Sequence, residues 1–281
     1  MSIKKYQFLL NNGKHPYSLP EVILGDRIPK TIYQTYKSWD ALKPELKKNI
    51  DYICKLNPGW SYHFFDDEDV EKFILAEYGS DILKEYVSIS PELGPARADL
   101  FRYLLLYKKG GVYLDIKTTL TQPLDSVLRD DDLFILSHWE KQLIQPKELK
   151  YLNYKEYIQW AILSTCGHPF LKEVLHNVLG NLQVYNPWLH GVGKKAVLRI
   201  TGPYAYTCAI EPKKLDFPHR FANVTQDLGI HYSLYELGTE NHCQQQTKNH
   251  MSDKNHYSKS KQLVVIKDTM SSLLYRILHK N

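Results

Sequence analysis

The chain has 281 residues, of which 43% are hydrophobic and 24% are charged. This balance is typical of a folded globular protein and excludes a disordered one. Its 36 basic and 31 acidic side chains give a net charge of +5. The lysines and arginines form no dense block, which argues against nucleic-acid binding. The mild positive charge suits an anionic substrate such as a phosphorylated metabolite.

Cysteine and apolar patterns indicate the compartment. Cys54, Cys166, Cys208 and Cys243 are widely spaced, which excludes a disulfide framework and a CxxC zinc site and favours reduced thiols. The first residues lack the apolar core of a signal peptide, and no window reaches the roughly 18 apolar residues of a membrane helix. We therefore expect a cytoplasmic protein without a membrane span.

Strand and helix patterns alternate up to residue 119, after a polar stretch at 1–27 that we expect to form an N-terminal arm. In chain order they predict a strand at 28–36, a helix near 42–55, a strand at 60–65, a helix between the acidic run 66–69 and Gly79, a helix at 96–109 and a strand at 112–119. The acidic run complements the positive end of the helix after it and is expected to cap it. Such alternation is typical of an α/β protein with a parallel sheet.

The second half of the chain has a less regular pattern. It predicts a strand at 133–136, a helical segment at 154–185, a helix from Thr201-Gly202-Pro203, a polar loop at 238–262, a strand at 263–266 and a terminal helix. We expect one domain over 28–281, with a helical region around 140–200.

Charged residues concentrate in the stretch 96–119. Asp99 and Arg102 are three residues apart on a predicted helix and therefore share a face. Strand alternation places Tyr113, Asp115 and Lys117 together on one face of the strand that follows. Ligands of parallel α/β sheets bind outside the carboxyl ends of the strands, so these residues are candidates for a binding site. Two ordinary ion pairs, Asp99–Arg102 and Asp115–Lys117, are the alternative interpretation.

Four segments follow one another along the chain in a characteristic order and spacing: 28–36, Asn57-Pro58-Gly59-Trp60, 96–102 and 110–115. Together they resemble the DXD-containing glycosyltransferases of family 32, over about residues 28–125 and weakly at 201–203. The resemblance implies a GT-A (Rossmann-like) core, an α/β fold with a mostly parallel sheet flanked by helices. It also implies transfer of a sugar from a nucleotide-sugar donor to a glycan or other hydroxyl acceptor, with retention of anomeric configuration and with the helical region on the acceptor side.

The resemblance also implies roles for individual residues. Thr35 and Tyr36, the latter where the family usually has tryptophan, would hold the nucleoside base of a UDP- or GDP-sugar. Asp99 would bind sugar or ribose hydroxyls, and Arg102 the sugar or diphosphate. Asp115 would be the first acid of the DXD motif and a catalytic residue together with Arg102, with Tyr113 and Lys117 as further donor-binding residues.

The motif departs from the family at Lys117, which stands where the second aspartate is expected. In the family that carboxylate helps to bind Mn²⁺ or Mg²⁺, and an ammonium group repels such a cation. Three possibilities stay open: Asp115 holds a metal with residues of the late loop, for which His256 is the candidate ligand; Lys117 itself neutralises the diphosphate; or Lys117 points outward.

Two other classes of protein remain. A catalytically silent module that binds nucleotide-sugars or glycans is favoured by the altered motif. A glycoside hydrolase requires two carboxyl groups about 5–10 Å apart. The hydrolase is disfavoured because the acids of this stretch are matched to basic residues.

Overall fold

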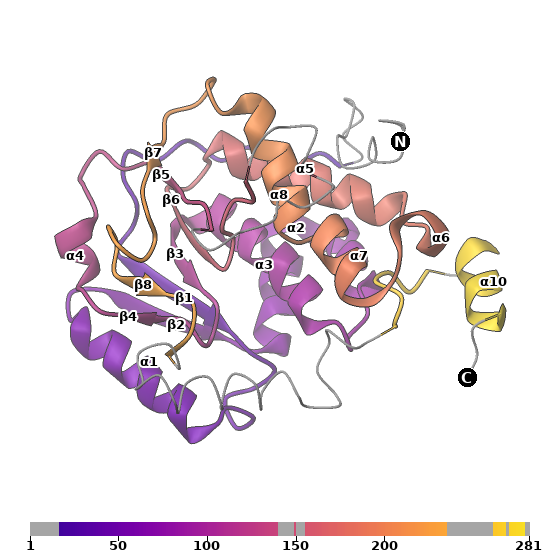
Figure 1. Ribbon diagram of the computed structural model, residues 1–281, viewed down its shortest axis with the longest axis horizontal. Helices are drawn as coiled ribbons and strands as arrows, with labels where there is room; N and C mark the ends of the chain where they lie inside the picture. The colour runs from indigo at the N-terminus through magenta and orange to yellow at the C-terminus, as the bar shows by residue number, and fades with distance from the viewer. Residues whose placement is uncertain (1–16, 140–148, 150–154, 235–260, 268–269, 279–281) are drawn as a thin grey trace.

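The computed structural model describes residues 17–139, 149, 155–234, 261–267 and 270–278 (Figure 1). In the main sheet, β1, β2 and β3 are parallel, β6 is antiparallel to β3 and β5, and β7 is parallel to β5. Five of its strands therefore point the same way and β6 runs against them, which confirms the expected α/β fold with a mostly parallel sheet. The strand order is β2 (Ser61–Phe65), β1 (Thr31–Thr35), β3 (Gly111–Leu114), β6 (Ala161–Ser164), β5 (Phe134–Leu136) and β7 (Arg220–Phe221).

A second sheet pairs β4 (Thr119–Leu120) with β8 (Ile230–His231). The helices are α1 (Pro44–Leu56), α2 (Asp67–Ser88), α3 (Gly94–Lys109), α4 (Leu124–Val127), α5 (Pro169–Gln183), α6 (Pro187–His190), α7 (Gly193–Ile200), α8 (Pro203–Ile210) and α10 (Met270–Leu278), with a 3-10 turn at Glu211–Lys213. Within the described ranges, no helix combines the length and the apolarity needed to cross a bilayer.

Side chains of the central strands alternate between two cores. Tyr33 and Tyr113 join a cluster that includes buried side chains of α2, α3, α5 and α8. Ile32, Val112 and Leu114 join a second cluster on the other side, with residues of α1 and α4. The strand residues thus follow the period of two that pleating imposes. Figure 1 shows α1 on one side of the sheet and α3, α5 and α8 on the other.

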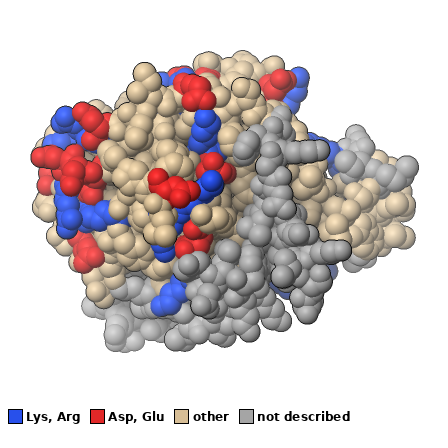
Figure 2. Space-filling model, turned by 90° about the horizontal axis from the view of Figure 1, so that it is seen from above, with Lys and Arg blue, Asp and Glu red and all other residues tan. Residues whose placement is uncertain are grey.

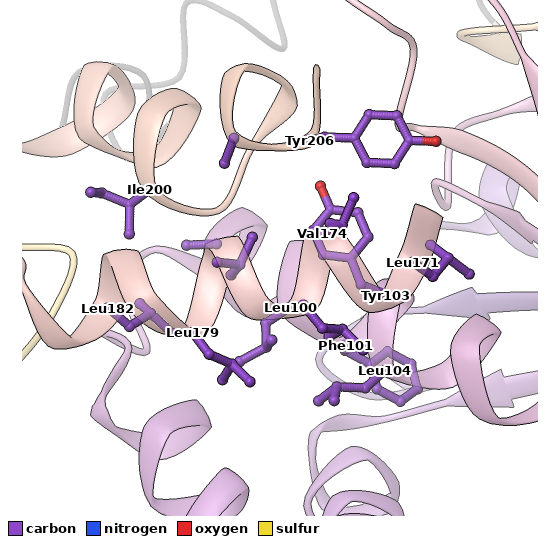
Figure 3. Packing of buried hydrophobic residues seen from close by; sticks show 14 of the residues in the cluster. Leu100, Phe101, Tyr103, Leu104, Leu171, Val174, Leu179, Leu182, Ile200 and Tyr206 are labelled. Atoms are coloured by element: carbon purple, nitrogen blue, oxygen red, sulfur yellow. The ribbon is translucent and has the colours of Figure 1, made fainter. Parts of the chain in front are cut away.

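Helix α3 lies at the centre of the larger core and is buried along most of its length. Its Leu100, Phe101 and Leu104 are fully buried, and Figure 3 shows them beside leucines of α5. Tyr103 points toward Tyr206 of α8, with stacked rings whose centroids are 5.6 Å apart. Because α3 contacts neighbours on several sides, the charged side chains that it carries are held in one place.

Turn residues end and begin the helices as the sequence predicts. Asp66 accepts from the backbone N–H of Asp69, whose side chain in turn accepts from the backbone N–H of Asp66, which confirms the capping role of the acidic run. Gly79 has φ 80° and breaks α2, but a second helical segment continues to Ser88. Gly110 ends α3 with φ 65°, a conformation that favours glycine.

The predicted strand at 112–119 is wrong beyond Leu114. Strand β3 ends there, and a turn follows in which the N–H of Thr118 donates to the carbonyl of Asp115 at 2.8 Å. The side-chain amide of Gln34 also donates to that carbonyl, at 3.1 Å. Thr119 then enters the second sheet. β-branched residues favour extended backbone in either sheet, so their pattern does not reveal where the chain leaves the first one.

Two predictions for the second half are also wrong. The segment 154–185 contains strand β6 before helix α5, so the helical region around 140–200 is helical from Pro169 onward in its described part. Strand β6 is buried on both faces, and a short apolar run of this kind has no period that separates it from a helix. At 263–266 a single bridge, Val265 to Ile89, replaces the expected strand.

The described part of the N-terminal arm packs on the domain. Leu19 is buried in the larger core, and the Tyr17 hydroxyl donates to Glu85 at 2.7 Å. Cys54, Cys166 and Cys208 are not joined in disulfides. Cys243 lies outside the described residues, and so does the loop expected at 238–262 except for its last two residues.

Acidic and basic side chains are interspersed on the surface. On the face that Figure 2 shows, they lie close to one another and neither sign forms a continuous block. One exposed ion pair joins Lys30 to Asp125 at 2.9 Å. The expectation that the protein does not bind nucleic acid stays a prediction.

Candidate active site

A cavity of about 500 Å³ opens beside Asp115, just after β3. Because β6 runs antiparallel to β3, the residues before β6 lie next to Asp115, whose N–H donates to the carbonyl of Trp160 at 2.8 Å. Residues from α3, from the segments after β5 and before β6, and from α7 and α8 complete the lining. The cavity therefore lies at the edge of the sheet where ligands of parallel α/β proteins bind.

One side of the cavity consists of Asp99, Arg102 and Asp115, which we call the charged wall. Arg102 Nη2 lies 2.9 Å from Asp115 Oδ1 and 3.4 Å from Asp99 Oδ1. The side chains of Arg102 and Asp99 are only 3% and 4% exposed, whereas that of Asp115 is 27% exposed. Asp115 is thus the member of the charged wall that a ligand in the cavity can reach most easily.

Each nitrogen of the Arg102 guanidinium has a partner inside the protein. Besides the ion pairs of Nη2 with the two carboxylates, Nε donates to the Ala98 carbonyl at 3.2 Å. Nη1 donates to the backbone and side-chain oxygens of Gln159 at 2.7 and 2.5 Å. These contacts fix the guanidinium beside Asp115, and the predicted contact of Arg102 with a donor stays a prediction.

Asp99 is surrounded by donors. Thr201 Oγ1 donates to its Oδ2 at 2.9 Å, and Gln159 Nε2 donates to its Oδ1 at 3.1 Å. Burial raises the pKa of Asp99 to about 6, although Arg102 and Thr201 favour the ionised form. Asp99 is accordingly ionised at neutral pH and titrates in the mildly acidic range.

The Arg102 guanidinium lies over the ring of Tyr113, 4.6 Å from its centroid. Burial opposes the charge of Arg102, but Asp115, Tyr113 and Asp99 together hold its pKa above the ordinary value. Tyr113 is itself fully buried and packs below the charged wall. The guanidinium thus remains positive inside the fold, and Tyr113 supports it from below by a cation–π contact.

Trp139, Trp160 and Tyr232 form an aromatic part of the lining, which we call the aromatic wall. Their ring centroids are 5.1 to 5.8 Å apart and their planes are inclined to one another. The ammonium of Lys117 lies 3.8 Å from the centroid of the Tyr232 ring. Aromatic faces of this kind suit a sugar ring or a nucleobase, both of which combine flat apolar surface with a polar rim.

Helices α7 and α8 close the remaining side. Lys194 in the first turn of α7, Val197 and Leu198 further along it, and Pro203 at the start of α8 line the cavity. Thr201, between the two helices, carries the hydroxyl that binds Asp99. This side adds one cationic group and apolar surface to the cavity.

Residues 43–135 match the family model described as "Glycosyltransferase sugar-binding region containing DXD motif". The matched range includes the whole charged wall. This stretch, about a third of the chain, is therefore similar to the sugar-binding region of DXD-containing glycosyltransferases.

Several curated proteins that are similar to this chain are named as mannosyltransferases of yeasts. An initiation-specific alpha-1,6-mannosyltransferase of Schizosaccharomyces pombe is 28% identical over 193 residues, which are 65% of this chain and 48% of that protein. Its Candida albicans counterpart is 27% identical over 53% of this chain and 42% of that protein. Inositol phosphoceramide mannosyltransferase 3 of S. pombe is 36% identical over 36% of this chain and 27% of that protein. The chain thus spans about half or less of the length of these relatives.

Solved structures of two glycosyltransferases are similar at a lower level. The PaToxG glycosyltransferase matches with a TM-score of 0.47 and 15% identity over 75% of this chain and 74% of that chain. A glycosyltransferase involved in glycosylation of the major capsid of PBCV-1 matches with a TM-score of 0.40 and 11% identity, over 78% and 98% of the two chains.

Of the residues that the DXD resemblance singles out, the structure brings Asp99, Arg102 and Asp115 together in the cavity. Lys117 is not on the same strand face as Asp115, because both follow the end of β3, but its ammonium still lies beside a cavity residue, Tyr232. His256, the candidate metal ligand, lies outside the described residues.

The two residues expected at the nucleoside base, Thr35 and Tyr36, do not line this cavity. Thr35 Oγ1 donates to the carbonyl of Phe65 at 2.8 Å. Tyr36 packs beside Ile116 in a small apolar cluster under α1. Both lie at the carboxyl end of β1, next to Gln34, whose amide binds the Asp115 backbone. Their contact with a nucleoside stays a prediction. If they make this contact, the base lies outside the cavity, near the end of β1.

Sequence reasoning missed the aromatic wall and Gln159. These residues lie outside the recognised stretch, and each alone is an unremarkable core or loop residue in the sequence. The available signal was position: Trp139 follows β5 and Gln159 precedes β6. Because β5 and β6 are antiparallel, the end of β5 and the start of β6 lie at the same edge of the sheet, beside the cavity. The sequence alone did not show that β6 is antiparallel to its neighbours.

The described residues do not supply the oxygen ligands that Mn²⁺ or Mg²⁺ prefers. They contain no group of three or more histidine, cysteine, aspartate or glutamate side chains that could hold a metal ion. One Asp115 oxygen binds Arg102, and both oxygens of Asp99 accept from neighbouring side chains. In place of the second DXD carboxylate stands Lys117, so a divalent cation does not fit this donor set.

Proposed function

We propose that this protein transfers a sugar from a UDP- or GDP-linked donor to a hydroxyl group of a glycan or another acceptor, with retention of configuration. The observation on which the proposal rests is the cavity, whose lining combines the ion-paired Asp99, Arg102 and Asp115 with the aromatic wall. The match of residues 43–135 to the sugar-binding region of DXD-containing glycosyltransferases supports the reaction class. The names of the curated relatives support mannose as the sugar.

In the proposed reaction the bond between the anomeric carbon and the diphosphate oxygen breaks, and its electron pair stays on that oxygen. The acceptor hydroxyl oxygen forms the new bond on the same face of the sugar, and its proton passes to the departing phosphate oxygen. This step needs no separate general base from the protein. The protein contributes orientation of the two reactants and stabilisation of the charge that develops on the diphosphate.

Each side of the cavity has a role in this proposal. Asp115, the most accessible carboxylate of the charged wall, accepts from sugar hydroxyls with the oxygen that does not bind Arg102. Trp139 and Tyr232 stack against the apolar face of a sugar ring. The α7 and α8 part of the lining, with Lys194, Val197 and Leu198, receives the acceptor, because the charged and aromatic walls are assigned to the donor.

A donor panel tests the proposal. UDP- and GDP-linked sugars, including those of mannose, are added to the full chain and thermal unfolding is followed with and without Mn²⁺. A donor at 100-fold its dissociation constant stabilises the folded state by about 2.7 kcal/mol. Donors that stabilise the protein are then incubated with mannose-terminated acceptors, and the glycosylated product is measured by mass spectrometry. Stabilisation by none of the donors would contradict the proposal.

A silent binding module is the second candidate, because Lys117 interrupts the DXD motif. It predicts that a donor stabilises the protein but is neither transferred nor hydrolysed. Release of free sugar or of nucleoside diphosphate, measured without acceptor, separates the two candidates. Turnover that is abolished by Asp115→Ala would exclude the silent module.

A further inference from the structure

A glycosyltransferase has to offset the negative charge of the donor diphosphate, and the described cavity lacks ligands suited to a metal ion. Hard divalent cations take about six oxygen ligands, mostly carboxylates, carbonyls and water. Here the carboxylates of the charged wall are committed to Arg102, Gln159 and Thr201. A cation bound to Asp115 would also have to approach Arg102, whose guanidinium lies 2.9 Å from Asp115 Oδ1. Like charges at such distances repel strongly in a buried site.

The position of Lys117 offers another source of positive charge. Lys117 lies in the turn after Asp115, which the Thr118 N–H to Asp115 carbonyl bond closes. Its own carbonyl accepts from the N–H of Leu234 at 2.8 Å, so its backbone is held on both sides. Its ammonium lies 3.8 Å from the ring centroid of Tyr232, a residue that lines the cavity. The ammonium is therefore held within one ring of the cavity, two residues from the carboxylate that starts the motif.

We propose that the Lys117 ammonium neutralises the diphosphate of the donor in place of a divalent cation. The inference rests on the proposed function and deepens it, because it assigns charge compensation to one side chain. The compact ammonium acts as a point charge with three donors toward phosphate oxygens. When the sugar leaves, the negative charge that stays on the diphosphate is offset by this ammonium, while Arg102 keeps Asp115 in place.

Binding of nucleoside diphosphates tests the inference without any transfer reaction. UDP and GDP are each titrated into the full chain by calorimetry, once in excess EDTA and once with Mn²⁺. We expect the preferred nucleotide to bind in EDTA with an affinity close to that in Mn²⁺. Lys117→Ala should weaken binding in EDTA about tenfold, since the variant loses a charge-assisted contact to phosphate.

Two more variants sharpen the test. Lys117→Asp restores the second DXD carboxylate, so it should bind the nucleotide poorly in EDTA and recover affinity when Mn²⁺ is added. Lys195→Ala is the matched control, because Lys195 is an exposed lysine next to Lys194 and does not line the cavity. It should bind the nucleotide like the wild type in both buffers. Circular dichroism confirms that each variant is folded.

Wild-type protein alone can overturn the inference, so the result does not depend on a variant that folds. Binding of UDP or GDP that requires Mn²⁺ and is lost in EDTA shows that a metal ion supplies the charge, and the proposed function then stands without Lys117 in this role. Unchanged affinity of Lys117→Ala in EDTA also overturns it. Absence of binding by either nucleotide in both buffers contradicts the proposed function itself.

Discussion

The charged wall and the aromatic wall line the same cavity but are built in different ways. The charged wall comes from a single short stretch, Asp99 to Asp115, and its members bind one another through hydrogen bonds and ion pairs. The aromatic wall collects Trp139, Trp160 and Tyr232 from segments that span more than ninety residues of sequence. Chemistry is thus concentrated locally in the chain, whereas the shape of the cavity depends on long-range packing.

The difference has an energetic consequence. A buried charged group that loses its partner leaves an uncompensated charge in a medium of low polarity, so changes at the two buried members of the charged wall, Asp99 and Arg102, should alter both stability and activity. The aromatic rings border the cavity with less dependence on single partners. Changes among them should alter ligand affinity more than folding.

The largest effect is expected for Arg102→Ala. The variant leaves Asp99 and Asp115 without their common cation, so the free energy of unfolding should fall by about 3–5 kcal/mol. Urea unfolding followed by circular dichroism measures this. Arg27→Ala is the control: Arg27 pairs with the neighbouring Asp26 at the surface, and its loss should leave stability close to that of the wild type. Equal stability of both variants would show that the charged wall does not hold the fold.

Asp115→Ala should separate chemistry from folding within the charged wall. Asp115 is the partly exposed member, so we expect folding to be nearly unchanged while sugar transfer falls by roughly 10²–10³-fold, the range for loss of one electrostatic group. Single-turnover rates with the donor identified in the panel measure the effect. Asp125→Ala removes an exposed carboxylate outside the cavity and should keep the wild-type rate. Near wild-type turnover of Asp115→Ala would move the active site elsewhere.

The pH dependence of stability should report on Asp99. Its pKa is raised from 3.8 to about 6 mainly by burial, so between about pH 4 and pH 6 the folded state binds more protons than the unfolded state. Stability contributed by this group is present below pH 4 and is lost as the pH rises to 6, with a slope of at most about 1.4 kcal/mol per pH unit. The stability difference between wild type and Asp99→Asn should decrease over this window and stay constant above it.

Asp125→Asn is the control for that titration. Hydrogen bonds from Lys30 and Trp60 lower the pKa of Asp125, so its contribution has the opposite sign and is small because the group is exposed. Urea unfolding from pH 4 to pH 8 measures both variants. A stability difference for Asp99→Asn that increases between pH 4 and pH 6 would show that the ionised form is favoured by its partners more than burial opposes it.

The smallest effect is expected in the aromatic wall. Trp139→Ala removes one ring that borders the cavity, and we expect KM for the donor or the acceptor to rise roughly two- to tenfold, with little change in kcat. Trp39→Ala is the matched control, because Trp39 is exposed and packs on Phe64 away from the cavity. A fall in kcat with unchanged KM would mean that Trp139 orients the reacting groups and not merely the bound ring.

Much of the charged wall was predictable because its residues are close in sequence. A spacing of three on a helix puts Asp99 and Arg102 on one face. The glycine pair after the helix predicts its end, just before the strand that leads to Asp115. The error at Lys117 has a local cause as well. Ile116 and Thr118-Thr119 favour extended backbone, but the chain turns at Asp115. There the Gln34 amide donates to the carbonyl of Asp115, and the N–H of Asp115 donates to the carbonyl of Trp160.

The sequence by itself determined the α/β class, the order of helices and strands from β1 to β3, the strand β5, and the carboxylates and arginine of the proposed chemistry. These follow from local periodicity, capping and turn residues, which act between near neighbours. Only the tertiary structure decided that β6 runs against its neighbours, that Gln159 joins Asp99 to Arg102, and that three distant aromatic residues complete the cavity. Strand direction and packing depend on contacts between segments far apart in the chain, and no local pattern encodes such contacts.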